Sequence, residues 1–320
     1  MVSLWPTLFN EVAQTVHTPA LSFSGTELYA VDTTPKEYNT PYITSYVIVP
    51  EPRDPLIVVD PGPRCCIKPL ISLLEELRGE ERGIIVIVTH VHIDHAGSAG
   101  LIASKYNALV YVHPRGAPHL ENTGKLWRAS REYLGRIAEI YGEPERVPQE
   151  LVKATRDGET IRLNALSLQI LHTPGHASHH QSIIVEASER VLFPGDSAGI
   201  VHPLVDAVVP TTPPPLKLDR YIESLKRQMS LKPDKIAYTH TGVSKASMLD
   251  RHMRQIMLWE DTLKEKADIS VDDALKLLYE TDPETRAFVD AIANVSKLLM
   301  EALKHSIDGF LTYYRGAKAK

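Results

Sequence analysis

The sequence predicts a mixed α/β fold, in which short apolar strands alternate with helices along most of the 320-residue chain. Three observations carry this prediction. Ile84–Val88 is apolar throughout, as in a strand that is buried on both faces of a sheet. Lys68–Arg78 places its leucines at helical spacing. After Gly242 the strand-like runs stop and helical periodicity continues to the end of the chain.

Two strands and a helix open the predicted order. Thr44–Val49 is β-branched and aromatic, and a proline ends it. Leu56–Val59 is a short apolar run that stops at the turn signal Asp60-Pro61-Gly62. The helix Lys68–Arg78 is followed by a glycine that suits a C-cap. The buried strand Ile84–Val88 comes next.

The middle of the chain continues this alternation. The same criteria predict helices at Leu101–Tyr106, Leu126–Tyr141 and Tyr221–Met229, and strands at Leu109–Val112, Ile161–Leu163, Leu166–Leu171, Ser182–Glu186, Val191–Phe193 and Lys235–Thr239. Val208–Leu216 contains four prolines and is predicted to be a loop. This loop and the segment Pro114–Pro148 are the candidates to wall a substrate pocket.

The last part of the chain is predicted to be helical. Ser244–Ala267 has an apolar side that includes three methionines. Ser270 precedes Val271–Tyr279 at capping-box spacing. Thr281 or Asp282 caps a further helix that begins at Pro283. One face of that helix is expected to carry Phe288, Ile292, Val295 and Leu299.

Composition excludes several classes of protein. A net charge of −5 without a basic block argues against nucleic acid as a partner. No apolar run approaches the ~18–20 residues of a membrane helix, so no membrane partner is expected. Met1–Asn10 has no basic and apolar pattern of a secretory signal, which makes a cytoplasmic location the expectation. The chain has 14 His but only the adjacent Cys65 and Cys66, so metal ligands would be nitrogen and oxygen.

The strongest local signal follows the buried strand and reads Thr89-His90-Val91-His92-Ile93-Asp94-His95. In extended backbone His90 and His92 point the same way, and a turn could bring Asp94 and His95 to the same centre. Imidazole and carboxylate together suit zinc, with iron or manganese as less selective alternatives. Surface loop positions would explain one histidine, but not three with an aspartate at this spacing.

This run resembles the His-x-His-x-Asp-His signature of the metallo-β-lactamase superfamily. The superfamily's other turns follow in order as Thr173-Pro174-Gly175-His176, Gly195-Asp196, His240 after a late strand, and the earlier Asp60-Pro61-Gly62. The resemblance implies a four-layer αββα sandwich with metals at one edge between the sheets. It implies a catalytic domain over 1–243, with a helical insertion at about 114–148, and a C-terminal helical region over 244–320 that packs on the core.

The resemblance also implies the site. His90, His92 and His176 would hold one divalent metal ion, and Asp94, His95 and His240 would hold a second, with Asp196 bridging the two. Zinc is expected, and iron or manganese are the alternatives. Asp94 would also accept or relay a proton. Four residues each have two interpretations. Asp60 orients a ligand histidine or is a plain turn residue. His179 and His180 enter the pocket or lie on a turn, and His202 contacts substrate or lies at the surface.

The function implied is a dinuclear metal-dependent hydrolase, related to glyoxalase II-like and lactonase-like enzymes. A hydroxide that bridges the metals would cleave a thioester, lactone or carboxylic ester in a small molecule. The same centre suits a phosphodiesterase, a phosphotriesterase or a ribonuclease. An iron-dependent oxidoreductase or dioxygenase is the alternative from another class. The partner expected is a small-molecule substrate, and a homodimer stays open beside a monomer.

Overall fold

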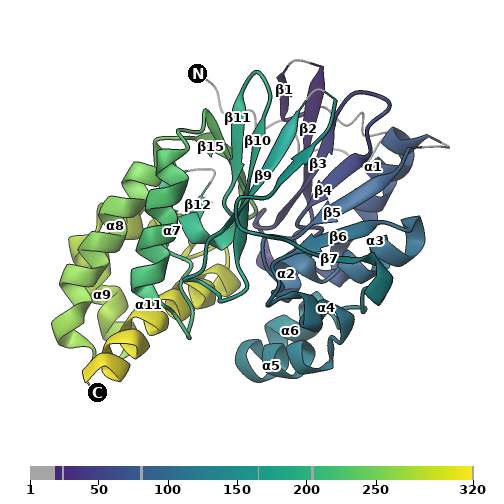
Figure 1. Ribbon diagram of the computed structural model, residues 1–320. Coiled ribbons are helices and arrows are strands. Elements are labelled where there is room, and N and C mark those ends of the chain that lie inside the picture. Colours follow the sequence, from purple (N-terminus) through teal and green to yellow (C-terminus); the bar gives the residue numbers. More distant parts are fainter. Residues whose placement is uncertain (1–18, 24, 80–81, 165, 203–204, 319–320) are drawn as a thin grey trace.

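Two β-sheets lie face to face at the centre of the molecule (Figure 1). The computed structural model describes residues 19–23, 25–79, 82–164, 166–202 and 205–318, so Met1–Asn10 lies outside the described residues. The first sheet has the order β1 (Leu21–Phe23), β2 (Thr26–Asp32), β3 (Thr44–Val49), β4 (Leu56–Val59), β5 (Ile84–Ile87), β6 (Leu109–Val112) and β7 (Val152–Ala154). The second has the order β15 (Gly242–Lys245), β14 (Lys235–Tyr238), β11 (Arg190–Phe193), β10 (Gln181–Glu186), β9 (Ser167–His172) and β8 (Thr160–Arg162). A separate pair joins β12 (Ile200–His202) to β13 (Ala207–Val209).

Helices cover the outer face of each sheet (Figure 1). Those in the first half of the chain are α1 (Lys68–Arg78), α2 (Ile93–Ala96), α3 (Ala99–Tyr106), α4 (Ala117–Glu121), α5 (Gly124–Leu134) and α6 (Arg136–Tyr141). Those in the second half are α7 (Leu218–Ser230), α8 (Met248–Leu263), α9 (Val271–Thr281), α10 (Pro283–Ile292) and α11 (Lys297–Lys318). Short 3-10 helices lie at η1 (Lys36–Tyr38), η2 (Arg64–Cys66), η3 (Gln149–Leu151), η4 (Gly195–Ala198) and η5 (Lys264–Lys266).

Apolar side chains fill three layers between these elements. Tyr46 of β3 and Ile170 of β9 belong to the layer between the two sheets. Leu70 of α1 packs in the layer outside the first sheet, and Leu225 of α7 packs outside the second. The order helix, sheet, sheet, helix confirms the predicted four-layer αββα sandwich. Among the described residues, no helix combines the length and apolar character that crossing a membrane requires.

Strand direction brings the predicted site residues to one edge of the sandwich. β4, β5 and β6 run parallel, so the segments after β4 and β5 leave the first sheet at the same edge. β11 and β14 run parallel in the second sheet, and Asp196 and His240 follow them. The backbone N–H of Thr44 donates to the carbonyl of Thr239 at 2.7 Å, which ties the two sheets together at this edge.

Two predicted helices are wrong in their extent. Leu126–Tyr141 is two helices, because Gly135 adopts φ +53° between α5 and α6. Ser244–Ala267 begins as strand β15, which pairs antiparallel with β14, and the helix starts only at Met248. Residues 242–245 contain no apolar run, so their own sequence does not predict a strand. The predicted domain boundary falls within this strand.

The predicted C-terminal face is also interrupted. α10 ends at Ile292 and Val295 is 43% exposed, so the supposed face of Phe288, Ile292, Val295 and Leu299 is divided between two helices. Ser296 accepts a hydrogen bond from the N–H of Leu299 and so begins α11. The predicted proline-rich loop begins two residues late, because Val208 and Val209 complete β13.

His252 on α8 is a fully buried histidine whose Nε2 lies 2.8 Å from the hydroxyl of Tyr221. Burial lowers the pKa of His252 to about 3 from its ordinary 6.5. Below about pH 6.5 the unfolded chain therefore binds a proton that the folded chain excludes, so stability is lost as the pH falls. We expect this histidine to contribute about 2 kcal/mol to the loss of unfolding free energy between about pH 8 and pH 5.

Urea unfolding of the wild type and His252→Gln at the two pH values checks this expectation. Glutamine cannot take up a proton, so the variant's unfolding free energy should fall by about 2 kcal/mol less than that of the wild type. Equal pH dependence in the two proteins would contradict the assignment, whatever the absolute stability of the variant.

Candidate metal centre

Asp60 is the anchor of the site. It follows β4 and has a φ of +48°. This left-handed conformation is uncommon for residues other than glycine, and such residues cluster at functional sites. Its carboxylate accepts hydrogen bonds from the N–H and the hydroxyl of Thr89, both at 2.7 Å. It also accepts from Nδ1 of His95 at 2.8 Å and from the hydroxyl of Thr239 at 2.7 Å. One buried carboxylate therefore fixes the ends of β5 and β14 and orients one histidine.

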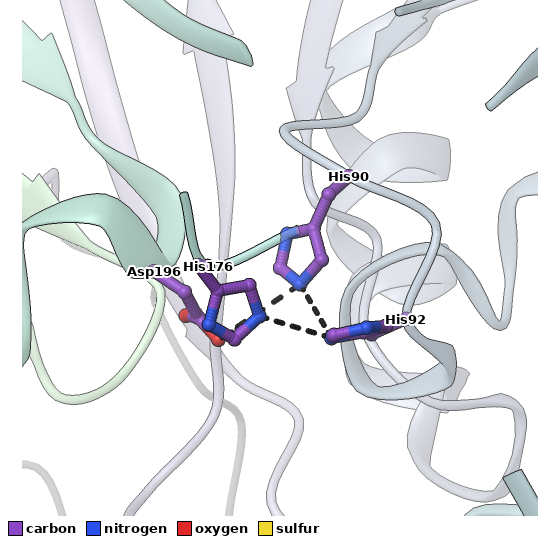
Figure 2. Close-up of side chains that lie close together, drawn as sticks. All are labelled: His90, His92, His176 and Asp196. Atoms are coloured by element: carbon purple, nitrogen blue, oxygen red, sulfur yellow. Dashed lines mark hydrogen bonds and ion pairs between the residues drawn. The ribbon is translucent and has the colours of Figure 1, made fainter. Parts of the chain in front are cut away.

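The first group of candidate ligands is His90, His92, His176 and Asp196, which Figure 2 shows converging from two sides. Nδ1 of His92 lies 2.9 Å from Nε2 of His90 and 3.1 Å from Nε2 of His176. Nδ1 of His176 donates to the carbonyl of Thr211 at 2.8 Å, which leaves Nε2 to face the centre. Four ligand atoms of this group lie within 4.8 Å of one another.

The second group is Asp94, His95 and His240. Oδ2 of Asp94 lies 3.9 Å from Nε2 of His95 and 3.7 Å from Nε2 of His240. Nδ1 of His240 faces the carbonyl of Tyr42 at 3.3 Å, and the ring of Tyr42 stacks on that of His240 with centroids 4.2 Å apart. Both histidines thus present Nε2 to the centre while Nδ1 is held from outside, as is usual for metal-ligating histidines.

Asp196 lies between the two groups. Its Oδ1 is 3.3 Å from Nε2 of His95 and 3.4 Å from Nε2 of His240. Its Oδ2 is 3.3 Å from Nε2 of His176 and 3.8 Å from Nε2 of His90. One oxygen faces each group, which is the arrangement that a bridging carboxylate needs.

The donor atoms fit a pair of divalent ions. Nε2 of His95 and Oδ1 of Asp196 are buried and have no hydrogen-bond partner, which is costly unless another group satisfies them. Five imidazoles and two carboxylates offer the nitrogen and oxygen ligands that zinc binds. Among the described residues, the structure thus brings together every residue predicted from sequence as a metal ligand.

The electrostatics keep His90, His92 and Asp196 in the forms that bind metal, whereas they favour the protonated form of His95. Burial and the neighbouring histidines hold the pKa of His90 and of His92 well below the ordinary value, so both are neutral at pH 7. Burial alone would raise the pKa of Asp196, but the histidines around it, His95 first, hold it well below its usual range. Burial would likewise lower the pKa of His95, but three carboxylates, Asp196 first, raise it well above the ordinary value. Because a metal must displace this proton, the second group should bind metal more tightly as the pH rises.

Two glycines let the turns close around the site. Gly175 precedes His176 with φ +147°, and a Cβ there would lie 2.4 Å from Cα of Tyr221. Gly195 precedes Asp196 with φ +55°, and a Cβ there would lie 2.7 Å from Nε2 of His180. A side chain at either position would push the following ligand out of place.

Three of the four residues left open from sequence lie at the site. Asp60 orients His95, as described. Nε2 of His180 accepts a hydrogen bond from the N–H of Asp196 at 3.1 Å, and its Nδ1 lies 2.8 Å from the hydroxyl of Thr173. His180 therefore supports the turn of Asp196 from behind. His179 lines the pocket. Burial is the main cause that lowers its pKa to about 4, and the neighbouring His176 adds to it.

His202 is not brought to the site. It is 2% exposed on β12, and its ring meets that of Phe288 edge to face with centroids 5.6 Å apart. The expectation of a surface residue is therefore wrong, and it does not line the pocket over the metal centre. The reason is that β12 and β13 pack against the C-terminal helices, with β13 in contact with α10.

Sequence reasoning missed the two threonines that hold Asp60. Thr89 and Thr239 each come directly before a candidate ligand, His90 and His240, at the end of a strand. The repeated Thr-His pair was the sequence signal that could have identified these threonines. Only the fold shows that both bind Asp60, because they follow strands of different sheets.

Five of the seven candidate ligands line a pocket of about 340 Å³. α5, α6, α11 and the proline-rich loop wall it. The candidate ligands in its lining are His92, Asp94, His176, Asp196 and His240. The other lining residues are mostly apolar or aromatic, and they are Tyr38, Tyr42, Val91, Ile93, His119, Lys125, Leu126, Ala129, Ser130, Tyr133, Leu134, Ile137, Tyr141, His179, Thr211, Pro213, Pro214, Ala302, His305 and Ser306. The predicted insertion at about 114–148 supplies α5 and α6 to this lining.

The sequence profile of the metallo-beta-lactamase superfamily matches residues 39–240, the stretch that holds every candidate ligand. The chain belongs to the metallo-beta-lactamase superfamily. A relative in this superfamily, the metallo-beta-lactamase fold-containing protein ST1585 from Sulfurisphaera tokodaii, is 34% identical over 191 residues, which are 58% of this chain and 69% of that protein. The crystal structure of ST1585 superposes with a TM-score of 0.64 at 29% identity, over 82% of this chain and 98% of that one.

Two further proteins extend the comparison. The probable metallo-hydrolase MJ0888 of Methanocaldococcus jannaschii is 29% identical over 157 residues, which are 48% of this chain and 66% of that protein. The family protein TTHA1429 of Thermus thermophilus has a TM-score of 0.59 at 22% identity and covers 92% of this chain and 94% of its own. This second likeness is one of fold, and it reaches beyond the residues that the superfamily profile matches.

Proposed function

We propose that this chain is a dinuclear metal-dependent hydrolase. The observation that carries the proposal is the position of Asp196, whose two oxygens face separate groups of histidines beside a pocket. Two ions bound there would lower the pKa of a water molecule toward neutrality and polarise the bond to be cleaved. The name of the relative MJ0888, a probable metallo-hydrolase, supports the same class of activity.

Within this proposal the chain's own residues have distinct tasks. Asp196 and the five histidines position the ions, and Asp60 and His180 hold two of these ligands in place. Asp94 has 18% of its side chain exposed, against 5% for Asp196, so it is the carboxylate of the centre more open to the pocket. We assign Asp94 to accept the proton of the attacking water. Zinc is the proposed metal because imidazole nitrogen dominates the donor set.

The proposed substrate is a small molecule with an ester-like bond, which is a thioester, a lactone or a carboxylic ester. The lining supports this choice over a phosphate diester, because Lys125 is the one lysine or arginine among the lining residues that the structure describes. A phosphate-binding site would be expected to offer several cations or helix N-termini to the anion.

The test is a panel of substrates assayed with a panel of metals. Protein stripped by a chelator is reconstituted with zinc, manganese, iron or cobalt and offered a thioester, a lactone, a carboxylic ester, a phosphodiester and a phosphotriester. We expect hydrolysis of the ester-like substrates only after metal is restored. Hydrolysis by the stripped protein would overturn the metal requirement, and a preference for phosphate esters would overturn the substrate class. Stoichiometric redox-active iron with oxygen consumption would overturn hydrolysis itself.

A further inference from the structure

Two walls from distant parts of the chain give the pocket its apolar lining. Leu126 and Leu134 of α5 and Ile137 of α6 line one side, and Ala302 of α11 lines the other. Figure 1 shows α5 and α6 below the edge of the first sheet, with α11 reaching across from the helices that cover the second. This part of the lining carries mostly hydrocarbon, so a ligand that contacts it must offer an apolar group.

The rim of the cleft is defined by a contact between these walls. The ring of Tyr133 on α5 lies against that of His305 on α11, with centroids 5.0 Å apart. Tyr133 is 42% exposed although it lines the pocket, and Ala129, one turn earlier, is exposed as well. The apolar lining is therefore open to solvent at this end, which is unfavourable unless a ligand covers it.

The α11 wall is fixed in place by the proline-rich loop. The hydroxyl of Thr212 donates to the carbonyl of Ser306 at 3.0 Å, and the N–H of Thr212 donates to the Ser306 hydroxyl at 3.2 Å. Gly309 allows this approach, because a Cβ there would lie 1.6 Å from the Thr212 carbonyl oxygen. The cleft is thus formed before a ligand arrives, which reduces the entropy that binding must overcome.

Few side chains with a carboxylate, ammonium or guanidinium group line the cleft. Among the described lining residues, the carboxylates are Asp94 and Asp196, and Lys125 lies exposed on α5. The other described lining residues carry no carboxylate, ammonium or guanidinium group. An uncharged chain bound here would leave no buried charge without a partner.

We infer that the cleft between α5–α6 and α11 binds the apolar acyl chain of the substrate, whose ester or thioester carbonyl lies at the metal centre. The inference rests on the proposed function and names its substrate class. In the reaction, water adds to the carbonyl carbon, the bond to the leaving oxygen or sulfur breaks, and a carboxylic acid and an alcohol or thiol are released. The acyl chain stays in the cleft throughout and contributes binding energy only.

The size of the effect follows from the area that each methylene buries. Burial of one methylene contributes about 0.8 kcal/mol, which is about fourfold in kcat/KM at 1.36 kcal/mol per tenfold. The value of kcat/KM should therefore rise about fourfold for each added methylene until the chain fills the cleft, and then stop rising.

The experiment uses the metal-loaded full-length protein with the p-nitrophenyl esters of acetate, butyrate, hexanoate and octanoate. Two variants, Ala129→Trp on α5 and Ala302→Trp on α11, place a large side chain in the cleft. Glu132→Trp is the matched control, because Glu132 is exposed on α5 but does not line the pocket. We expect each cleft variant to lose 10-fold or more of the octanoate rate, as several methylenes are displaced, and to lose much less of the acetate rate. The control should match the wild type on all four esters.

A second measurement separates the inference from the proposed function. Binding of the octanoate anion, followed by calorimetry, should weaken about 10-fold or more in both cleft variants and stay unchanged in the control. If acetate and octanoate esters are cleaved at equal rates and the variants change neither rates nor octanoate binding, the acyl cleft is overturned while hydrolysis stands. If no ester is cleaved but octanoate still binds in the cleft, the proposed function fails and the apolar site remains.

Discussion

Replacement of Asp196 by alanine is expected to remove bound metal and hydrolytic activity together while the fold survives. The carboxylate is the one group that faces both sets of histidines, and its loss leaves Asp94 as the only carboxylate of the candidate ligands. Without it, two ions would lose the carboxylate that offsets their mutual repulsion. The expected fall in kcat/KM is on the order of 10⁴-fold, as for other groups that act as one catalytic unit.

Two comparisons make this prediction specific. Asp196→Asn keeps the size of the side chain and removes its charge, so a similar loss in both variants would identify charge as the cause. Asp250→Ala removes an exposed carboxylate from α8 and should behave as the wild type. Metal content by mass spectrometry and thermal unfolding by circular dichroism are the measurements. An Asp196→Ala protein that keeps two ions per chain would contradict the bridging role.

Replacement of Asp60 by alanine should destabilise the fold by about 3–5 kcal/mol, as expected when one partner of a buried charged pair is removed. The substitution leaves the N–H and hydroxyl of Thr89, the hydroxyl of Thr239 and Nδ1 of His95 without an acceptor in a site closed to water. Because His95 loses the group that orients it, metal affinity at the second group should fall by about 10–100-fold.

Urea unfolding and metal titration separate the two consequences of the Asp60 change. Asp60→Asn keeps one acceptor oxygen, so its unfolding free energy should lie between those of the wild type and Asp60→Ala. Thr239→Val removes one hydroxyl donor and little else, and should cost about 1 kcal/mol. An unchanged unfolding free energy in Asp60→Ala would show that Asp60 is only a turn residue.

The fold and the candidate ligands could be predicted because their signals are local. Each candidate ligand directly follows a predicted strand or stands in a short turn, and Leu56–Val59, Lys68–Arg78 and Leu109–Val112 have the predicted bounds. Buried parallel strands show continuous apolar runs, and their ends meet at one sheet edge. The positions of His90 and His240 therefore followed from the order of strands.

The parts that could not be predicted depend on contacts between distant segments. Gly135 lies within a helical pattern, and only its φ of +53° divides α5 from α6. Residues 242–245 form a strand because β14 offers them an edge, not because their own sequence favours one. The wall that α11 gives to the pocket depends on the fit of Gly309 against the carbonyl of Thr212. None of these positions has a periodicity that could reveal its role.

The division of the candidate ligands between the two sheets has a thermodynamic consequence. The loops after β5 bring His90, His92, Asp94 and His95 from the first sheet, while His176, Asp196 and His240 come from the second. Ions held there would join the two halves of the sandwich, so any metal that binds only the folded chain stabilises it by mass action. At a free metal concentration 100 times the Kd, this linkage is about 2.7 kcal/mol for each site. The candidate metal centre would then also stabilise the fold, and the free metal concentration in the surroundings would set the free energy of unfolding.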